Sequence, residues 1–206
     1  DGRFEANVFE RLGYEVSDTG AWYSGRSWTR RGHTIAGNTF RTIKNTEGFA
    51  LGFLHVMSVY LDDMISGTTI VNNTFQDVQT GILLGGSRDV LVESNKFEDV
   101  GDYAIFVDKR GLRYDRYLCV YNSTFTGRFP REMIELHYDE PPYSTAYPQL
   151  ATTLIDHQCW PCHINILHNR YCRVGKAFTR PNTETLKSWL DLVRDNTEAA
   201  DCAAAE

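Results

Sequence analysis

Short apolar segments recur along the chain, and the same polar and aromatic pattern follows each of them. Segments such as Val90-Leu91-Val92 and Leu118-Cys119-Val120 are rich in residues that favour β-strands and are predicted to form them. An Asn comes next, then any residue, then an aromatic ring, as in Asn7-Val8-Phe9, Asn38-Thr39-Phe40, Asn73-Thr74-Phe75, Asn95-Lys96-Phe97, Asn169-Arg170-Tyr171 and the longer Asn122-Ser123-Thr124-Phe125. This repeat predicts short strands that stack layer upon layer, with equivalent residues about 4.8 Å apart.

A second set of apolar segments shares one phase and predicts a second strand in each layer. The set is Val59-Tyr60-Leu61, Ile82-Leu83-Leu84, Ile105-Phe106-Val107 and Ile134-Glu135-Leu136. Alternation along a strand places the first and third residues of each segment inside. Leu61, Leu84 and Val107, which are two equal steps of 23 residues apart, should therefore form one buried column. We also expect Asn38, Asn73 and Asn95 to stack on one another.

Together, the two repeats predict an all-β fold: a right-handed parallel β-helix formed by residues 1–181. A β-sandwich with coincidental turns is the alternative. Residues 141–161 are expected to form a long loop. The tail, residues 182–206, is expected to be helical or irregular, with a helix around Leu186, Trp189, Leu190 and Val193. A final strand at residues 190–193 is the alternative for the tail.

The composition narrows the range of partners. The chain has 206 residues, 42% of them hydrophobic, and a net charge of -6, which argues against a nucleic-acid backbone as partner. No apolar run approaches the length of a membrane span, because His55 and Ser58 interrupt the longest one, residues 48–61. The chain opens with Asp1 and has no signal peptide, so we expect a longer precursor, with further β-helix layers or partner chains at the open ends.

Cysteine spacing suggests disulfides or thiols and no catalytic role. Cys159 and Cys162 have the spacing of redox and zinc sites, but no second such pair and no matching His pair follows. We therefore predict no metal site and no cofactor. The other cysteines are Cys119, Cys172 and Cys202. Glycosylation sequons at Asn72 and Asn122 favour a secreted, extracellular protein.

The same register predicts a charged outer face. The residues directly after the buried column are Asp62, Gly85, Asp108 and His137, and the next ones are Asp63, Gly86, Lys109 and Tyr138. Arg88, Asp89 and Arg110 lie one or two positions further on, so carboxylates and cations share this face. The alternative is structural: Asp caps turns, Gly supplies positive φ, and the charges form a solvated ladder.

Asp62 and Asp108 are the predicted catalytic pair, with Asp63 as the reserve acid. Two layers separate them, or about 9–10 Å between Cα atoms. Inverting glycosidases hold their carboxyl groups roughly 6.5–9.5 Å apart, with a water between them. Gly85, midway, would let a sugar ring approach the backbone. The predicted substrate-binding residues are Arg88, Asp89, Lys109 and His137, with Trp22, Tyr23, Trp28 and Tyr60 as stacking platforms.

Three segments resemble right-handed parallel β-helix repeat proteins of the pectin-lyase-like group, some of which are similar to glycoside hydrolase family 141. The segments are Gly20–Gly32 with its two tryptophans, Val59–Gly67 with Asp62-Asp63, and Gly85–Asp89; the likeness covers roughly residues 15–180. The resemblance implies an acid from the Asp62-Asp63 turn and a second acid one or two layers later. Ser27 stands where relatives often carry Asp, which removes one acidic candidate.

The predicted function is therefore that of a secreted, carbohydrate-active protein that hydrolyses a polysaccharide with a pair of Asp residues. A lyase or epimerase of uronic-acid polysaccharides is one alternative, with Lys109 or Arg88 as base and a cation to neutralise the substrate carboxylate. A non-enzymatic glycan-binding or structural subunit of a larger assembly is the other.

Overall fold

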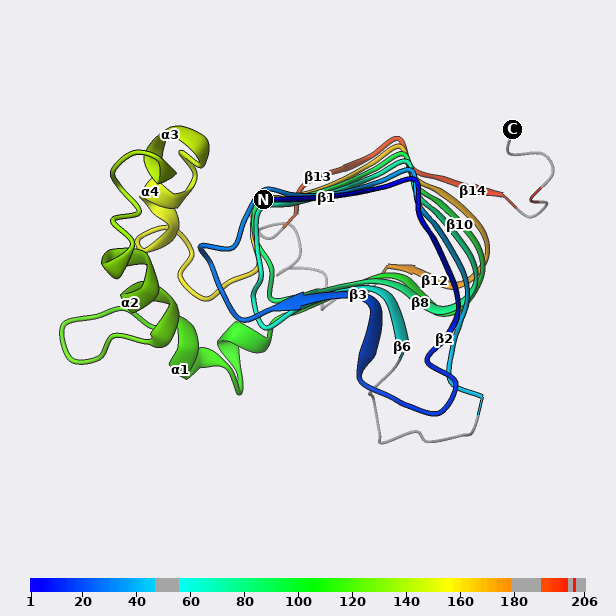
Figure 1. Cartoon of the computed structure of the whole chain (residues 1–206), viewed down its shortest axis with the longest axis horizontal. Helices are drawn as coiled ribbons and strands as arrows, with labels where there is room; N and C mark the ends of the chain where they lie inside the picture. Colours follow the sequence, from blue (N-terminus) through cyan, green and yellow to red (C-terminus); the bar gives the residue numbers. More distant parts are fainter. Residues whose placement is uncertain (47–55, 179–189, 200–201, 203–206) are drawn as a thin grey trace.

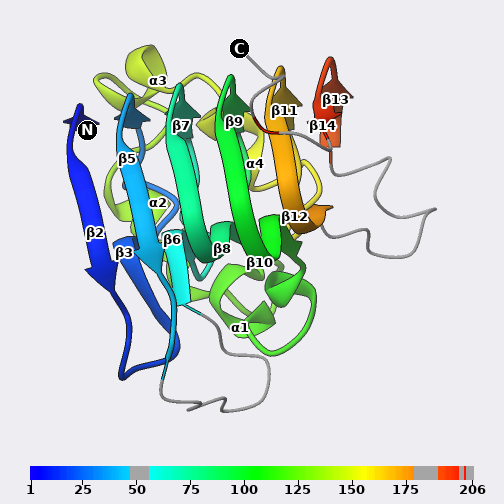
Figure 2. The ribbon, with the colours of Figure 1, turned by 90° about the vertical axis from the view of Figure 1, so that its right-hand side faces the viewer.

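The chain folds into two layers of parallel strands with a helical segment at one side (Figure 1). The computed structural model describes residues 1–46, 56–178, 190–199 and 202. Figure 2 shows the strands of the layers side by side, and within each sheet neighbouring strands are parallel. The chain passes back and forth between the two sheets, with β2 (Val8–Leu12) and β3 (Thr19–Gly25), and then β5 (Thr39–Ile43) and β6 (Val56–Asp62), following one another in the second sheet.

The first sheet has six parallel strands, and each element pairs with its counterpart in the next layer. In spatial order they are β1 (Gly2–Glu5), β4 (His33–Ala36), β7 (Thr68–Val71), β9 (Val90–Glu93), β11 (Ile164–Leu167) and β13 (Leu190–Arg194). The buried residues of these strands, such as Ile35, Ile70 and Val92, alternate with more exposed ones, as the period of a strand requires.

The second sheet has eight strands. Its main path is β14 (Thr197–Ala199), β12 (Arg170–Phe178), β10 (Lys96–Asp108), β8 (Thr74–Gly85), β5 (Thr39–Ile43) and β2 (Val8–Leu12). Two further strands, β6 (Val56–Asp62) and β3 (Thr19–Gly25), continue beside the second half of β8. The candidate site lies where β6, β8 and β10 end.

The helical segment lies between β10 and β11. It contains a 3₁₀ turn, η1 (Arg110–Leu112), and four helices, α1 (Arg116–Cys119), α2 (Arg128–Glu135), α3 (Tyr143–Ala146) and α4 (Leu150–Thr153). Its buried residues, among them Phe129 and Met133, form a second core with Trp28. This core is separate from the one between the sheets.

The predicted fold class is wrong. The chain is not an all-β solenoid but has two mostly parallel sheets with 14% helix, an α/β-like arrangement. Leu118-Cys119 and Ile134-Glu135, which the sequence suggested as strands, belong to α1 and α2. Phe129 and Met133 are four residues apart and both face the second core, which is helical periodicity. Part of the expected loop 141–161 likewise forms α3 and α4.

The predicted stacking of Asn residues is confirmed. The Nδ2 group of Asn38 donates to Oδ1 of Asn73 at 3.0 Å, and that of Asn73 donates to Oδ1 of Asn95 at 3.0 Å. The backbone N–H of each donates to the same oxygen of its neighbour. The ladder extends from Asn7 at one end to Asn196 at the other. Asn122 is not part of it, because its side chain caps its own exposed turn.

The interior stacks are confirmed as well. Leu61 pairs with Leu84 and Leu84 with Val107, and the three are 0%, 0% and 3% exposed. The aromatic rings of the repeat also stack, with centroids 4.7–5.4 Å apart in the order Phe9, Phe40, Phe75, Phe97 and Tyr171. Stacking of this kind fixes the register of one layer on the next.

The tail is strand where the structure describes it. Leu190–Arg194 forms β13 and Thr197–Ala199 forms β14, so the expected helix is wrong there and the alternative strand is right. Leu186 and Trp189 lie outside the described residues. β13 pairs with β11 in parallel, although the register shifts after its first residue.

Two disulfides join distant segments. Cys119 bonds to Cys159 and Cys172 bonds to Cys202, while Cys162 keeps a buried thiol. Cys159 is therefore paired across the helical segment and not with its neighbour in the Cys159–Cys162 motif. None of the helices in the described residues is long and apolar enough to cross a membrane.

Candidate functional site

A cavity of about 480 Å³ opens over the ends of β6, β8 and β10. Its apolar floor is made by aligned residues of these strands, because Tyr60 pairs with Leu83 and Leu83 with Phe106. These side chains alternate with the buried column and so point to the opposite face of the sheet. The polar wall consists of Asp18, Arg26, Asp62, Asp63, Asp108, Lys109, Arg110 and Arg113, beside Tyr103 and Tyr114.

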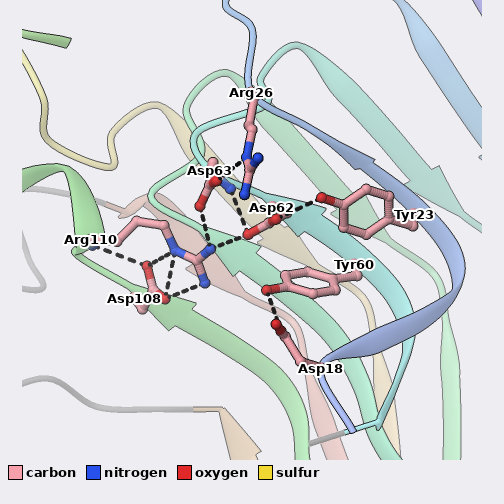
Figure 3. A network of polar contacts seen from close by, with 8 residues as sticks. All are labelled: Asp18, Tyr23, Arg26, Tyr60, Asp62, Asp63, Asp108 and Arg110. Carbon is pink, nitrogen blue, oxygen red and sulfur yellow. Dashed lines mark hydrogen bonds and ion pairs between the residues drawn. The ribbon is translucent and has the colours of Figure 1, made fainter. Parts of the chain in front are cut away.

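Arg110 is at the centre of the polar wall (Figure 3). Its guanidinium donates to Asp108 through Nε at 3.0 and 3.1 Å and through Nη2 at 2.8 Å. Its Nη1 donates to Asp63 at 3.0 Å and also to Asp62. One cation thus binds all three of the predicted acids. Burial would lower its own pKa, but the hydrogen bonds and the charge of Asp108, together with Tyr60 and Tyr114, outweigh burial, so the pKa is raised and Arg110 stays charged.

Gly85 makes this arrangement possible. It pairs with Asp108 in the sheet and lies between the ends of β6 and β10. A Cβ atom at this position would lie 2.7 Å from Cζ of Arg110, so only glycine leaves room for the guanidinium. The space over Gly85 was predicted to receive a sugar ring with a water between Asp62 and Asp108. Arg110 occupies it.

Two side chains of the neighbouring layer, at and just after the end of β3, donate hydrogen bonds to Asp62 and Asp63. The hydroxyl of Tyr23 donates to Oδ2 of Asp62 at 2.7 Å, and Nε of Arg26 donates to Oδ2 of Asp63 at 2.6 Å. The Tyr23 ring packs edge-on against Tyr60, with centroids 5.3 Å apart. All of these contacts converge on the turn that follows β6 (Figure 3).

The two adjacent carboxyl groups are shifted in opposite directions. Burial raises the pKa of Asp62, despite the hydrogen bond from Tyr23 and the charge of Arg110. Burial would also raise the pKa of Asp63, but its hydrogen bonds with Arg26, Asp62 and Arg110 outweigh it and the pKa is lowered. An acid with a raised pKa beside an ionised carboxylate is the arrangement that acid–base catalysis needs.

A fourth acid, Asp115, lies next to this pair. Burial and the nearby charge of Asp63 raise the pKa of Asp115 to about 6. Its Oδ2 atom is buried and receives no hydrogen bond from any group in the described part of the chain. Asp115 should therefore hold a proton over a wider pH range than an exposed Asp.

Several predicted site residues lie elsewhere. Arg88 is buried and donates to the carbonyl oxygens of Thr153 and Asp156, and Asp89 forms an ion pair with Arg31. These residues attach the helical segment to the sheets. His137 follows α2 and its side chain is 72% exposed. Trp22 packs in the core and Trp28 against Phe129, so neither is a stacking platform.

The site also contains residues that sequence reasoning missed. Arg110 was placed near the charged face but was given no role, and Asp115, Arg26 and Asp18 were not considered. Asp18 accepts a hydrogen bond from the Tyr60 hydroxyl at 3.0 Å. The one available signal was the short spacing of Asp108 and Arg110, which lets their side chains meet at the end of a strand.

The site thus defines a protein with an arginine-bridged carboxylate cluster at the ends of parallel strands. The chain matches no protein-family model, no curated protein and no solved structure. The resemblance noted in the sequence accordingly stays a prediction. Across residues 1–46, 56–178, 190–199 and 202, no group of three or more His, Cys, Asp or Glu side chains is arranged to hold a metal ion.

Proposed function

We propose that the cavity binds a glycan and that the protein hydrolyses a glycosidic bond, with Asp62 as acid and Asp63 as nucleophile. One observation carries this proposal: two adjacent carboxyl groups line one cavity with an aromatic floor, and their pKa values are shifted in opposite directions. Tyr60 is only 5% exposed and has the Arg110 guanidinium over its ring, so it is not the stacking platform that the sequence predicted. The half-buried rings of Tyr103 and Phe106, which line the cavity, suit the apolar side of a sugar ring, and the polar wall suits its hydroxyl groups.

In the proposed mechanism, Asp62 gives its proton to the glycosidic oxygen as the bond from that oxygen to the anomeric carbon breaks. One nitrogen of Arg110 contacts both carboxyl groups, so they are too close together for the water-filled gap of an inverting enzyme. Asp63 therefore attacks the anomeric carbon as that bond breaks and forms a glycosyl ester. A water then cleaves the ester, giving one proton to Asp62, which is now ionised, and releasing the Asp63 carboxylate. Arg26 and Arg110 keep Asp63 ionised before the reaction. Tyr23 holds the Asp62 carboxyl in one orientation.

Asp108 has a different role from the one the sequence suggested. The Arg110 guanidinium lies between its carboxylate and Asp62, where the water of the predicted pair would have to stand, so Asp108 does not act with Asp62. It instead holds Arg110 in place over Gly85. The lyase alternative also loses one of its two candidate bases, because Arg88 is buried away from the cavity.

A second candidate function is non-catalytic glycan binding. It is favoured by Arg110, which bonds to all three predicted acids and so could serve to hold the ends of β6 and β10 together. The two candidates share the cavity and differ in whether Asp62 and Asp63 do chemistry. In both cases we propose a secreted protein, since the two disulfides are typical of an oxidising compartment.

The test is release of reducing ends from a panel of plant, algal and microbial polysaccharides. We expect the native protein to cleave at least one of them, and Asp62→Asn and Asp63→Asn to lower its turnover by about 10²-fold or more. Asp108→Asn should have a smaller effect, about tenfold, through Arg110. Asp99→Asn is the matched control, because Asp99 forms an exposed ion pair with Arg173 on the same sheet.

Hydrolysis is excluded if no polysaccharide is cleaved, or if Asp63→Asn cleaves as fast as the native protein. Binding without cleavage, unchanged in both Asn variants, would instead support the second candidate. Thermal unfolding of each variant checks that the substitution leaves the fold intact.

A further inference from the structure

The segment that leads away from the cavity has a charge opposite to that of the whole chain. Residues 109–131 carry six basic side chains and one acidic side chain, whereas the chain as a whole has a net charge of -6. The basic residues are Lys109, Arg110, Arg113, Arg116, Arg128 and Arg131. Local charge of this kind attracts an anionic partner even to an acidic protein.

Two of these arginines are exposed and available. Arg113 lines the cavity and Arg116 begins α1, and both are exposed. Neither forms an ion pair with another residue in the described ranges. Arg110 differs, since it is buried and bound to three carboxylates, and Arg128 is paired with Glu132. Arg113 and Arg116 are therefore free to bind an external anion.

Tyrosines alternate with these arginines on the exposed side. Tyr114 is 60% exposed and lines the cavity, Tyr117 is 61% exposed, and Tyr121 is 41% exposed. Tyr114 precedes α1, Tyr117 lies within it and Tyr121 follows it, so the three rings are exposed within eight residues of the chain. The buried residues of the same stretch, Asp115 and Leu118, lie on the other side. Exposed rings in a row are uncommon on a surface that binds nothing.

We propose that Arg113, Tyr114, Arg116, Tyr117 and Tyr121, the Tyr–Arg strip, extend the cavity as a binding site for an anionic polysaccharide. The arginines bind its carboxylate or sulfate groups through paired N–H donors, and the tyrosine rings pack on the apolar faces of successive sugars. The inference names the substrate class of the proposed glycan site and rests on that proposal.

A single-stranded nucleic acid would also suit a surface of arginines and aromatic rings. The polysaccharide is favoured because the strip joins a cavity whose polar wall contains Asp62, Asp63 and Asp108. These carboxylates and the net negative charge of the chain repel a polymer with a phosphate on every residue. A glycan can place neutral sugars over the acids and its charged groups over the arginines.

The test uses matched polymers immobilised on a biosensor. Lightly carboxymethylated dextran is compared with dextran, and partly methyl-esterified polygalacturonate with its full methyl ester. Each pair shares one backbone and differs in charge, and neutral sugars separate the charged ones. A single-stranded DNA 20-mer is the fifth surface. We expect the native protein to bind at least one anionic glycan about tenfold or more tighter than its uncharged counterpart, and tighter than DNA.

The variants assign that binding to the strip. Arg113→Ala with Arg116→Ala should weaken it about tenfold, and Tyr117→Ala should weaken it several-fold. Arg3→Ala with Arg11→Ala removes the same charge from two exposed positions at the other end of the stack and should change it less than about twofold. The three variants alter exposed side chains, so each should unfold at the native temperature.

The possible results separate this inference from the proposed hydrolysis. Three results would each show that the strip does not bind an anionic polysaccharide. They are equal affinity for charged and uncharged glycans, an unchanged affinity of the Arg113→Ala, Arg116→Ala variant, and tighter binding of DNA. Suppose that Asp63→Asn loses cleavage while the variants of the strip bind the anionic glycan as tightly as the native protein. The proposed hydrolysis would then be supported, and the proposed role of the strip would be wrong.

Discussion

At the residue scale, Asp62 and Asp63 show how two adjacent and chemically identical side chains acquire different properties. Asp62 is buried against Tyr23, whereas Asp63 turns towards Arg26 and Arg110. Burial raises the pKa of Asp62. For Asp63, burial acts in the same direction, but the hydrogen bonds with Arg26, Asp62 and Arg110 together outweigh it and lower the pKa. The positive φ of Asp63, 36°, marks the turn that separates the two directions.

Asp115 gives a prediction on pH at this scale. Its pKa is about 6 in the folded protein, above the ordinary value of 3.8, so the fold favours its protonated form. The stability that this provides is present below pH 4 and is lost as the pH rises through 6. Asp115→Asn, which never ionises, should therefore raise Tm at pH 8 by about 2–4 °C and leave it unchanged at pH 3.5.

Thermal unfolding at both pH values measures the effect. Asp77→Asn is a suitable control, since Asp77 is paired with Lys44 on the surface. A Tm difference between Asp115→Asn and the native protein that is the same at pH 8 and pH 3.5 would contradict the raised pKa of Asp115.

The sequence located the acids of the site but not the cation between them. Asp62, Asp63 and Asp108 were found because each follows a buried residue of one column, and such offsets can be read along a chain. Arg110 was not, because a side chain that crosses a layer over a glycine depends on rotamer and packing. For the same reason, the sequence does not show that the Arg88 side chain is buried and not on the outer face.

At the element scale, the Asn ladder is the feature that joins one layer to the next. Each Asn in its middle accepts two hydrogen bonds on Oδ1 and donates through Nδ2 to a carbonyl oxygen of the layer before. Asn73 is 1% exposed, so water cannot replace these partners. Loss of such a side chain leaves several buried polar groups without partners.

Asn73→Ala should therefore lower the free energy of unfolding by roughly 2–3 kcal/mol. Asn7→Ala, at the exposed end of the ladder, is the matched control and should cost about 1 kcal/mol or less, because water reaches its partners. Urea titration of both variants gives the comparison. Equal losses would show that the ladder contributes no more in the middle than at its end.

Strand prediction succeeded where two independent patterns agreed and failed where one stood alone. Asn73 and Asn95 each had a β-rich segment before them and a second strand in phase after them, and both lie in the ladder. Asn122 also followed an apolar segment, but Leu118-Cys119 belongs to a helix. Three apolar residues in a row are equally compatible with a buried strand and with one helical turn.

At the scale of the whole molecule, the helical segment is attached to the sheets by buried charges and by a disulfide. Arg88 reaches the carbonyl oxygens at the end of α4, and Cys119 of α1 bonds to Cys159, 40 residues further on. The segment carries Arg110 and Asp115 into the site. The order of this segment and the geometry of the acids should therefore depend on each other.

Cys119→Ser with Cys159→Ser should lower the stability of the fold by about 4 kcal/mol, as expected for a closed loop of 40 residues. Because the segment holds Arg110, any activity at the cavity should fall with it. Cys172→Ser with Cys202→Ser is the matched control: it removes a loop of 30 residues on the far side and should reduce stability by a similar amount without affecting the cavity.

Denaturant unfolding and polysaccharide cleavage, measured on both double variants, separate the two effects. If the Cys119, Cys159 variant were as active at 25 °C as the Cys172, Cys202 variant, the helical segment would not be needed to position Arg110.

The Asn ladder also has a consequence for how this chain can change in length. Every layer offers the next one the same donors, acceptors and ring face. Asn38 and Asn73 are 35 residues apart and Asn73 and Asn95 are 22 residues apart, yet the hydrogen bonds that join them are the same. The connections between strands can therefore differ in length, and the long one between β10 and β11 leaves the stacking of the strands intact. One residue added inside a strand would instead exchange inner and outer side chains in that layer. Insertions and deletions among natural variants should accordingly occur between the strands and not within the repeated unit of Asn, any residue and an aromatic ring.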